Sequence, residues 1–291
     1  MKLAVIRLAG IDRVAFIIGE SVYTLTSNSA EAVSVARGTA WMLRQGLDAM
    51  RVAEERAHRL GKRTDVARAH LRPPILPGKI IGVGMNYHSF IAAAERSGIA
   101  VPKERLWFLR PPQCIAGPAD DVWLPRLPSF LDYEVELGIV IGRECRNVTP
   151  EEARHAIGGF TIANDLTLRD RIPRSVVLGK SFDTHTPIGP CIVTPDELGD
   201  PQGLHLTTWV NGELRQDSNT QEMIADCYTL VSEISSAGTL YPGDLILSGT
   251  PDGSGALRRP VIQLQAGDLV RLEIERIGAI ENRVIDEPAS A

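Results

Sequence analysis

Residues 131–141 alternate between apolar and polar side chains in the way that a β-strand requires. Successive side chains of a strand point to opposite faces, so residues two apart share a face and lie about 6–7 Å apart. Glu134 and Glu136 therefore share one face, while Tyr133 and Val135 face the other way and pack inward. Neighbouring carboxylates repel unless water solvates them or a cation lies between them. The segment predicts either the solvated face of a strand or a cation site.

A third carboxylate follows another apolar strand, which begins near Phe160 and ends at Asn164 and Asp165. On its own, an Asn-Asp pair at a strand end is more typical of a turn than of a ligand. Together with Glu134 and Glu136, however, Asp165 completes a set of three carboxylates without an accompanying His or Cys. Such an all-oxygen set suits a hard cation such as Mg²⁺, Mn²⁺ or Ca²⁺ rather than Zn²⁺.

The composition is that of a globular protein and excludes some partners. Of the 291 residues, 44% are hydrophobic and 23% are charged, which is enough apolar material for a core. The formal net charge of -5 provides no broad basic surface, so we expect no nucleic-acid partner. Arg7 interrupts the first apolar run and no run reaches membrane-spanning length, so we expect no membrane partner and a cytoplasmic location. The scattered cysteines lack a C-x-x-C pair, which predicts buried thiols.

The chain divides at a proline-rich segment. Three prolines and a glycine within residues 71–78 favour extended backbone, so we predict a linker there. We expect a small N-terminal domain at residues 1–72, with three short strands and then a helical stretch from about residue 30 to 60. A larger domain follows at residues 73–291.

Strand patterns dominate the larger domain, with a few helices among them. Thr149 and Glu152 have the spacing of a capping box, which predicts a helix start. A second helix is predicted at residues 221–237, with Ser218 or Thr220 as its cap. The predicted fold class is mainly β with some helices (α+β).

Six short segments of this larger domain follow one another in the order known from one enzyme family. They are residues 79–87, 132–137, 164–170, 179–184, 210–216 and 242–251. In these segments the sequence resembles the fumarylacetoacetate hydrolase (FAH) family, over most of residues 79–286. The resemblance implies a twisted β-roll catalytic domain after a small N-terminal domain, usually in a homodimer.

The resemblance also implies roles for individual residues. By position, the family's metal ligands, usually for Mg²⁺ or Mn²⁺, correspond to Glu134, Glu136 and Asp165. Lys180 matches the catalytic lysine near the bound substrate, although it could also be an ordinary surface lysine. The substrate-binding positions correspond to Arg169, Gly249 and Thr250, and Gly249 also suits a purely backbone-shaping role.

The sequence departs from the family pattern in the lid. The family usually has a His three residues beyond the tyrosine that matches Tyr87 and a Glu three further on, and this pair on a short helix activates water. Here those positions hold Phe90 and Ala93. We name His88 and Glu95 as candidate catalytic replacements. Their separation of seven residues puts them about two helical turns apart, too far for a direct pair.

Our leading hypothesis from the sequence is a divalent-metal-dependent hydrolase that cleaves a C–C bond in a small acylpyruvate-like or 2,4-dioxo acid, in a catabolic pathway for aromatic compounds or sugars. A metal-bound 2-keto acid forms an enolate, through which cleavage, decarboxylation and isomerisation all pass. Hydrolysis additionally needs a base that activates water. The alternatives are therefore a 2-keto-acid decarboxylase or a 2-hydroxyhepta-2,4-diene-1,7-dioate-type isomerase, for which Phe90 argues, and an inactive metal-binding family member.

Overall fold

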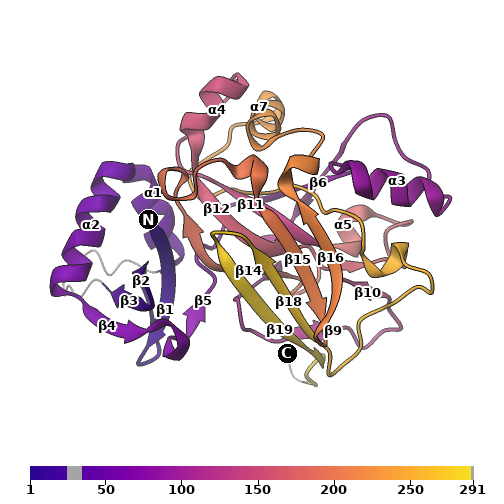
Figure 1. The fold of residues 1–291 in the computed structure, drawn as a ribbon, viewed down its shortest axis with the longest axis horizontal. Helices are drawn as coiled ribbons and strands as arrows, with labels where there is room; N and C mark the ends of the chain where they lie inside the picture. The colour runs from indigo at the N-terminus through magenta and orange to yellow at the C-terminus, as the bar shows by residue number, and fades with distance from the viewer. Residues whose placement is uncertain (25–34, 290–291) are drawn as a thin grey trace.

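The computed structural model describes residues 1–24 and 35–289 (Figure 1). The strands are β1 (Lys2–Leu8), β2 (Ile11–Ile18), β3 (Ser21–Thr24), β4 (Lys62–Asp65), β5 (Leu71–Arg72), β6 (Ile80–Gly84), β7 (Leu106–Arg110), β8 (Ile115–Ala116), β9 (Val122–Leu124), β10 (Leu131–Asp132), β11 (Val135–Ile141), β12 (Ile157–Asn164), β13 (Thr167–Leu168), β14 (Thr186–Val193), β15 (His205–Val210), β16 (Glu213–Asn219), β17 (Leu245–Leu247), β18 (Leu269–Ile274) and β19 (Gly278–Asp286). The α-helices are α1 (Val35–Gln45), α2 (Leu47–Leu60), α3 (His88–Arg96), α4 (Pro150–Ala156), α5 (Val176–Gly179), α6 (Pro195–Leu198) and α7 (Cys227–Ala237). Short 3₁₀ turns are η1 (Val66–Arg68), η2 (Pro112–Cys114), η3 (Pro201–Gly203), η4 (Thr220–Glu222) and η5 (Gly255–Leu257).

Two sheets organise the described residues. The larger has the order β4-β3-β2-β1-β14-β12-β11-β17-β6-β7, with β5 beside β1 and β8 beside β14. The smaller has the order β16-β15-β18-β19-β9, and β10 pairs with β13 separately. Strands β12 and β14 contact β18 and β19, so the two sheets pack against each other, and Figure 1 draws the smaller sheet in front. The predicted mainly β class with some helices is confirmed.

Strand β11 lies inside the larger sheet, between β12 and β17. Tyr133, Val135 and Leu137 are fully buried in the main core cluster, as their alternation predicts. The opposite face is buried too: Glu134 and Glu136 retain 4% and 2% of their exposure. The alternative of a solvated strand face is therefore wrong, because neighbouring elements cover both faces of this strand.

The N-terminal strands form as predicted, and the helical stretch consists of two helices within the described residues. Gly46 separates α1 from α2 and has a positive φ of 83°, which glycine adopts without strain. Residues 30–34, where the predicted stretch begins, lie outside the described part. The first two residues of the predicted linker form β5, which pairs with β1, and β1 also pairs with β14. The N-terminal strands thus continue the larger sheet (Figure 1), and the domain division at residue 72 stays a prediction.

The two predicted helix starts have different outcomes. The capping box of Thr149 and Glu152 is present at α4. The predicted start at residue 221 is wrong, because Met223 takes extended backbone after a 3₁₀ turn, and α7 begins only at Cys227. Asp226 caps it by accepting a hydrogen bond from the amide of Thr229 at 2.7 Å. The sequence pattern missed this cap because the apolar residues before it continue a helical period.

The last features of the fold to compare with the sequence are the burial of the cysteines and the length of the helices. The cysteines at positions 114, 145, 191 and 227 are free and buried, as predicted. Among the described residues, no helix combines the length and apolar character needed to span a membrane.

Candidate metal centre

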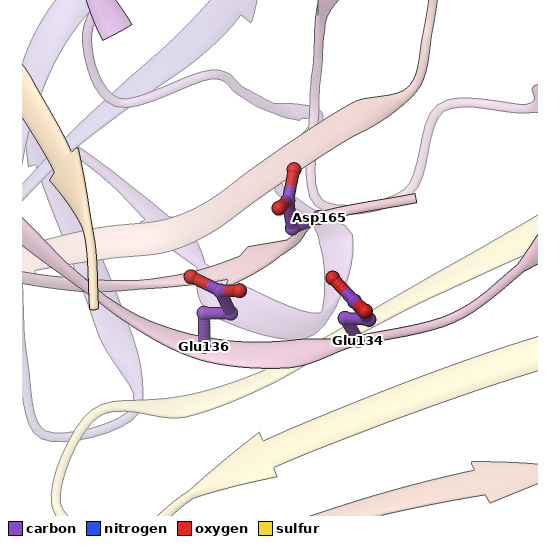
Figure 2. A group of neighbouring side chains, drawn as sticks. All are labelled: Glu134, Glu136 and Asp165. Carbon is purple, nitrogen blue, oxygen red and sulfur yellow. The ribbon is translucent and has the colours of Figure 1, made fainter. Parts of the chain in front are cut away.

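Three carboxylates meet where β11 and β12 pair. Glu134 directly precedes β11, Glu136 lies within it, and Asp165 directly follows β12. The antiparallel register, with Glu136 opposite Ala163, brings the start of one strand to the end of the other. One oxygen from each carboxylate lies within 4.8 Å of the others. Figure 2 shows the carboxylates of Glu134 and Glu136 turned toward the side on which Asp165 lies.

Backbone contacts hold the two ligand-bearing segments together. The amide of Asp165 donates to the carbonyl of Glu134 at 2.9 Å. The side chain of Asn164 accepts from the amide of Glu134 at 3.1 Å through Oδ1. The backbone of two candidate ligands is thus fixed without using their carboxylates, which remain directed into the site.

Two buried cations, Lys180 and Arg110, and the partly buried Arg169 contact the carboxylates. Lys180 Nζ donates to Glu134 Oε2 at 2.6 Å and contacts Asp165 Oδ2. Arg169 Nη2 donates to Glu134 Oε1 at 2.5 Å. Arg110 Nη1 forms an ion pair with Asp165 Oδ1 without hydrogen-bond alignment. Two of the three carboxylates are therefore neutralised by side chains on β7 and in the 169–180 segment.

Glu136 differs from the other two, because only the amide of Gly249 donates to it, at 2.8 Å, among the described residues. Burial, followed by the charge of Glu134, raises the pKa of Glu136 to about 8. For Glu134, burial acts in the same direction, but the charges of Lys180 and Arg169 outweigh it and lower the pKa.

The donor set fits a hard divalent cation. Three buried oxygens converge. A nearby positive charge would offset the burial and the repulsion by Glu134 that raise the pKa of Glu136. Cation affinity at such a site comes from carboxylates and not from nitrogen or sulfur ligands, which favours Mg²⁺, Mn²⁺ or Ca²⁺.

Burial also affects the cations. It lowers the pKa of Lys180, although Glu134 and then Glu136 act in the opposite direction. It lowers the pKa of Arg110 to about 10. Lys180 is held further by Thr167, whose Oγ1 lies 2.8 Å from Nζ. The surface-lysine alternative is wrong, because the Lys180 side chain is buried between the carboxylates.

Two of the three predicted substrate-side residues contact the carboxylates directly. Gly249 contacts Glu136 through its amide, and its φ of 95° suits glycine. Thr250 Oγ1 accepts from Gln216 Nε2 at 2.9 Å. Arg169 contacts Glu134, as described above.

The predicted lid residues lie on α3 (Figure 1). His88 and Glu95 are both exposed, and no ion pair or hydrogen bond joins their side chains within the described residues. Phe90 packs against the main core cluster, and Ala93 is buried. The two positions at which the family has its acid–base pair are therefore filled by apolar side chains.

Sequence reasoning missed two residues at the centre, Arg110 and Gln216. Arg110 is buried. The one sequence feature that could have predicted this is that Arg110 lies two residues from Phe108 on a strand and so shares its buried face. Gln216 Oε1 accepts from the amide of Val135 at 3.0 Å and so joins Thr250 to β11. No local pattern distinguishes this glutamine from an exposed one.

A mainly β fold with three buried carboxylates at the strand pair β11 and β12 is the arrangement of one enzyme family, and comparison with known sequences identifies that family. The family model described as Fumarylacetoacetate (FAA) hydrolase C-terminal matches residues 79–285, and the chain belongs to this family. It is 41% identical over 219 residues to the mitochondrial oxaloacetate tautomerase FAHD2B of Homo sapiens, covering 74% of this chain and 69% of that protein.

Solved structures of related proteins have the same fold. Maleylpyruvate hydrolase from Sphingobium sp. SYK-6, in complex with manganese (II) ion and pyruvate, superposes with a TM-score of 0.84 at 30% identity, over 99% of this chain and 100% of that one. The 2-hydroxyhepta-2,4-diene-1,7-dioate isomerase from Mycobacterium marinum has a TM-score of 0.76 at 31% identity, with 99% of each chain covered. Relatives of this chain therefore include a tautomerase, a hydrolase and an isomerase, and the hydrolase structure contains manganese.

Proposed function

We propose that this protein is a divalent-metal-dependent keto–enol tautomerase of a small 2-oxo acid, with oxaloacetate as the first substrate to test. One observation carries the proposal: the buried ammonium of Lys180 lies among the site carboxylates, while the lid positions hold Phe90 and Ala93 in place of an acid–base pair. Tautomerisation needs a proton carrier but no activated water. The similarity to oxaloacetate tautomerases supports the same assignment.

Glu134, Glu136 and Asp165 would hold the metal ion. When bound there, it would polarise the 2-oxo acid and ease removal of the proton beside the keto group. The manganese in the maleylpyruvate hydrolase structure supports Mn²⁺ as the first ion to test, followed by Mg²⁺ and Ca²⁺. The burial of the three carboxylates supports this role, because it excludes water that would compete for the same oxygens.

Lys180 would carry the proton. Its lowered pKa, caused by burial, makes the neutral amine more accessible near neutral pH than in an exposed lysine. Neutral Nζ takes a proton from the carbon beside the keto group, and the resulting ammonium donates it to the enol oxygen. One proton moves from carbon to oxygen, and no further reactant is needed. Thr167 orients Nζ during this transfer through the contact at 2.8 Å.

Thr250 would bind the substrate carboxylate. Its oxygen already accepts from Gln216, so its hydroxyl hydrogen remains available to donate. Arg169 adds positive charge beside the site and also holds Glu134. Gly249 contributes through its backbone, because its amide binds Glu136.

Hydrolysis of an acylpyruvate-like or 2,4-dioxo acid is the second candidate, and the similarity to maleylpyruvate hydrolase favours it. It would need His88 or Glu95 to move from the exposed surface of α3 to the centre, since both are exposed in the structure. Decarboxylation is the third outcome to test, because it passes through the same enolate.

The experiment separates these reactions by their products. The purified protein with Mn²⁺ is given oxaloacetate in its enol form, and separately an acylpyruvate, and products are followed by NMR. Relative to Mn²⁺ alone, we expect faster loss of the oxaloacetate enol and no additional pyruvate or carbon dioxide from either compound. Lys180→Met should reduce the rate at least 100-fold while Lys103→Met, which changes an exposed lysine, leaves it unchanged. Cleavage of the acylpyruvate, or unchanged tautomerisation in Lys180→Met, would contradict the proposal.

We further propose that the protein is a homodimer, as the family resemblance implies. Leu106, Trp107 and Leu109 are exposed on β7, the edge strand of the larger sheet, and such an apolar edge supports association. Sedimentation equilibrium gives the mass of the particle in solution and tests this directly. A cytoplasmic location stays a prediction, and the relatives compared above include a mitochondrial protein.

A further inference from the structure

Asp132 is a buried carboxylate two residues before Glu134, and four N–H groups donate to it. Its Oδ1 accepts from the amide of Tyr133 at 2.9 Å and from that of Gly255 at 2.7 Å. Its Oδ2 accepts from the amide of Ala256 at 3.1 Å and from Arg169 Nε at 2.8 Å. An ionised carboxylate has about four lone-pair sites. Asp132 is therefore saturated and has no oxygen left for a metal ion or a substrate.

Arg169 lies between two carboxylates. Its Nε donates to Asp132 at 2.8 Å, and its Nη2 donates to Glu134 at 2.5 Å. Despite burial, the charges of Glu134 and then Asp132 raise the pKa of Arg169, so the guanidinium stays charged. The same Glu134 also receives Lys180 on its other oxygen. A divalent ion that binds Glu134 must therefore compete with the positive charge of two side chains.

We propose that Asp132 is a positioning residue that draws the charge of Arg169 away from Glu134 and so keeps Glu134 available to a divalent cation. This inference rests on the proposed metal site. The shape of the guanidinium group of Arg169 allows both contacts, because its Nε binds Asp132 while its Nη2 binds Glu134. Without the Asp132 charge, Glu134 is the remaining anion in contact with Arg169 among the described residues, and Arg169 competes more strongly with the metal.

The backbone donors explain how Asp132 keeps its place. Gly255 and Ala256 belong to the turn η5, about 120 residues further along the chain, and their amides point at the carboxylate. These contacts come from a segment distant in the chain from the proposed ligands, so the anion that binds Arg169 is held by donors other than the site residues. A carboxylate held in this way fixes the guanidinium of Arg169 in one orientation.

The test is a double-mutant cycle on Mn²⁺ affinity, measured by electron paramagnetic resonance on the full chain. Asp132→Asn should raise the Kd about 10- to 100-fold. In an Arg169→Met background the same substitution should change the Kd less than about twofold, because the residue through which Asp132 acts is gone. An equal rise in both backgrounds would mean that Asp132 only anchors η5, and it would overturn the proposal.

A second variant keeps the test decisive if Asp132→Asn fails to fold. Arg169→Met alone should bind Mn²⁺ at least as tightly as the wild type, because a competing charge is removed. Weaker binding would overturn the proposal. The matched control is Asp170→Asn, whose carboxylate binds the amide of Phe130 at 2.9 Å and Arg171 at 3.1 Å, and which should leave the Kd unchanged.

The outcome for the wild type separates the two proposals. If the wild type does not bind Mn²⁺, the proposed metal site fails and this inference fails with it. If the wild type binds Mn²⁺ and Asp132→Asn binds it equally well, only the role of Asp132 is refuted.

Discussion

Acid should weaken divalent-cation binding, because Glu136 must lose a proton before it can act as a ligand. Burial and the charge of Glu134 raise its pKa from 4.5 to about 8. If each ion displaces this one proton, the apparent Kd is multiplied by about 100 at pH 6, about 10 at pH 7 and about 1 at pH 9. The change from pH 6 to pH 9 corresponds to about 2.7 kcal/mol of binding free energy, at about 1.36 kcal/mol per pKa unit.

Calorimetric titration with Mn²⁺ in two buffers of different ionisation enthalpy measures both the Kd and the number of protons released. We expect about 0.9 proton per ion at pH 7 and about 0.1 at pH 9. Lys180→Met is the control, because the ammonium of Lys180 contacts two of the carboxylates and could itself release a proton. A slope that disappears in this variant would belong to Lys180 and not to Glu136. A Kd that stays constant from pH 6 to pH 9 without proton release would refute the reasoning.

Three further predictions concern stability. In the metal-free protein the raised pKa of Glu136 favours the protonated folded state, so the stability it contributes is present in acid and lost as the pH rises through about 8. In urea unfolding, the wild type should therefore lose stability relative to Glu136→Gln between pH 5 and pH 8. Parallel curves for the two proteins would contradict this. Gly249→Ala adds a Cβ 3.0 Å from Asn86 Cβ at a φ of 95°, so it should cost about 1–3 kcal/mol of unfolding free energy, and an unchanged urea midpoint would count against the strain. Asp226→Ala removes the cap of α7 and should cost about 1 kcal/mol in the same assay, whereas a loss below about 0.3 kcal/mol would show that the cap is dispensable.

Local patterns in the sequence were enough to predict the strand that carries Glu134 and Glu136, the capping box at Thr149 and the mainly β class. These features depend on residues two to four apart, where strand and helix periods act directly. The start of α7 was misjudged, because the apolar period extends beyond the helix and only the backbone of Met223 ends it. Similarity to a family supplied what periodicity could not, namely that Lys180 belongs with the three carboxylates.

The sequence by itself determined which residues could act as oxygen ligands, that Glu134 and Glu136 share one strand face, and that Asp165 follows another strand. The tertiary structure alone decided that Arg110 and Gln216 join the site and that His88 and Glu95 lie exposed on α3. It also decided the pKa of Glu136, because this value depends on burial and on charges that strand pairing brings together. Charge and burial act through space, so contacts between residues distant in the chain set them, and no local pattern contains that information.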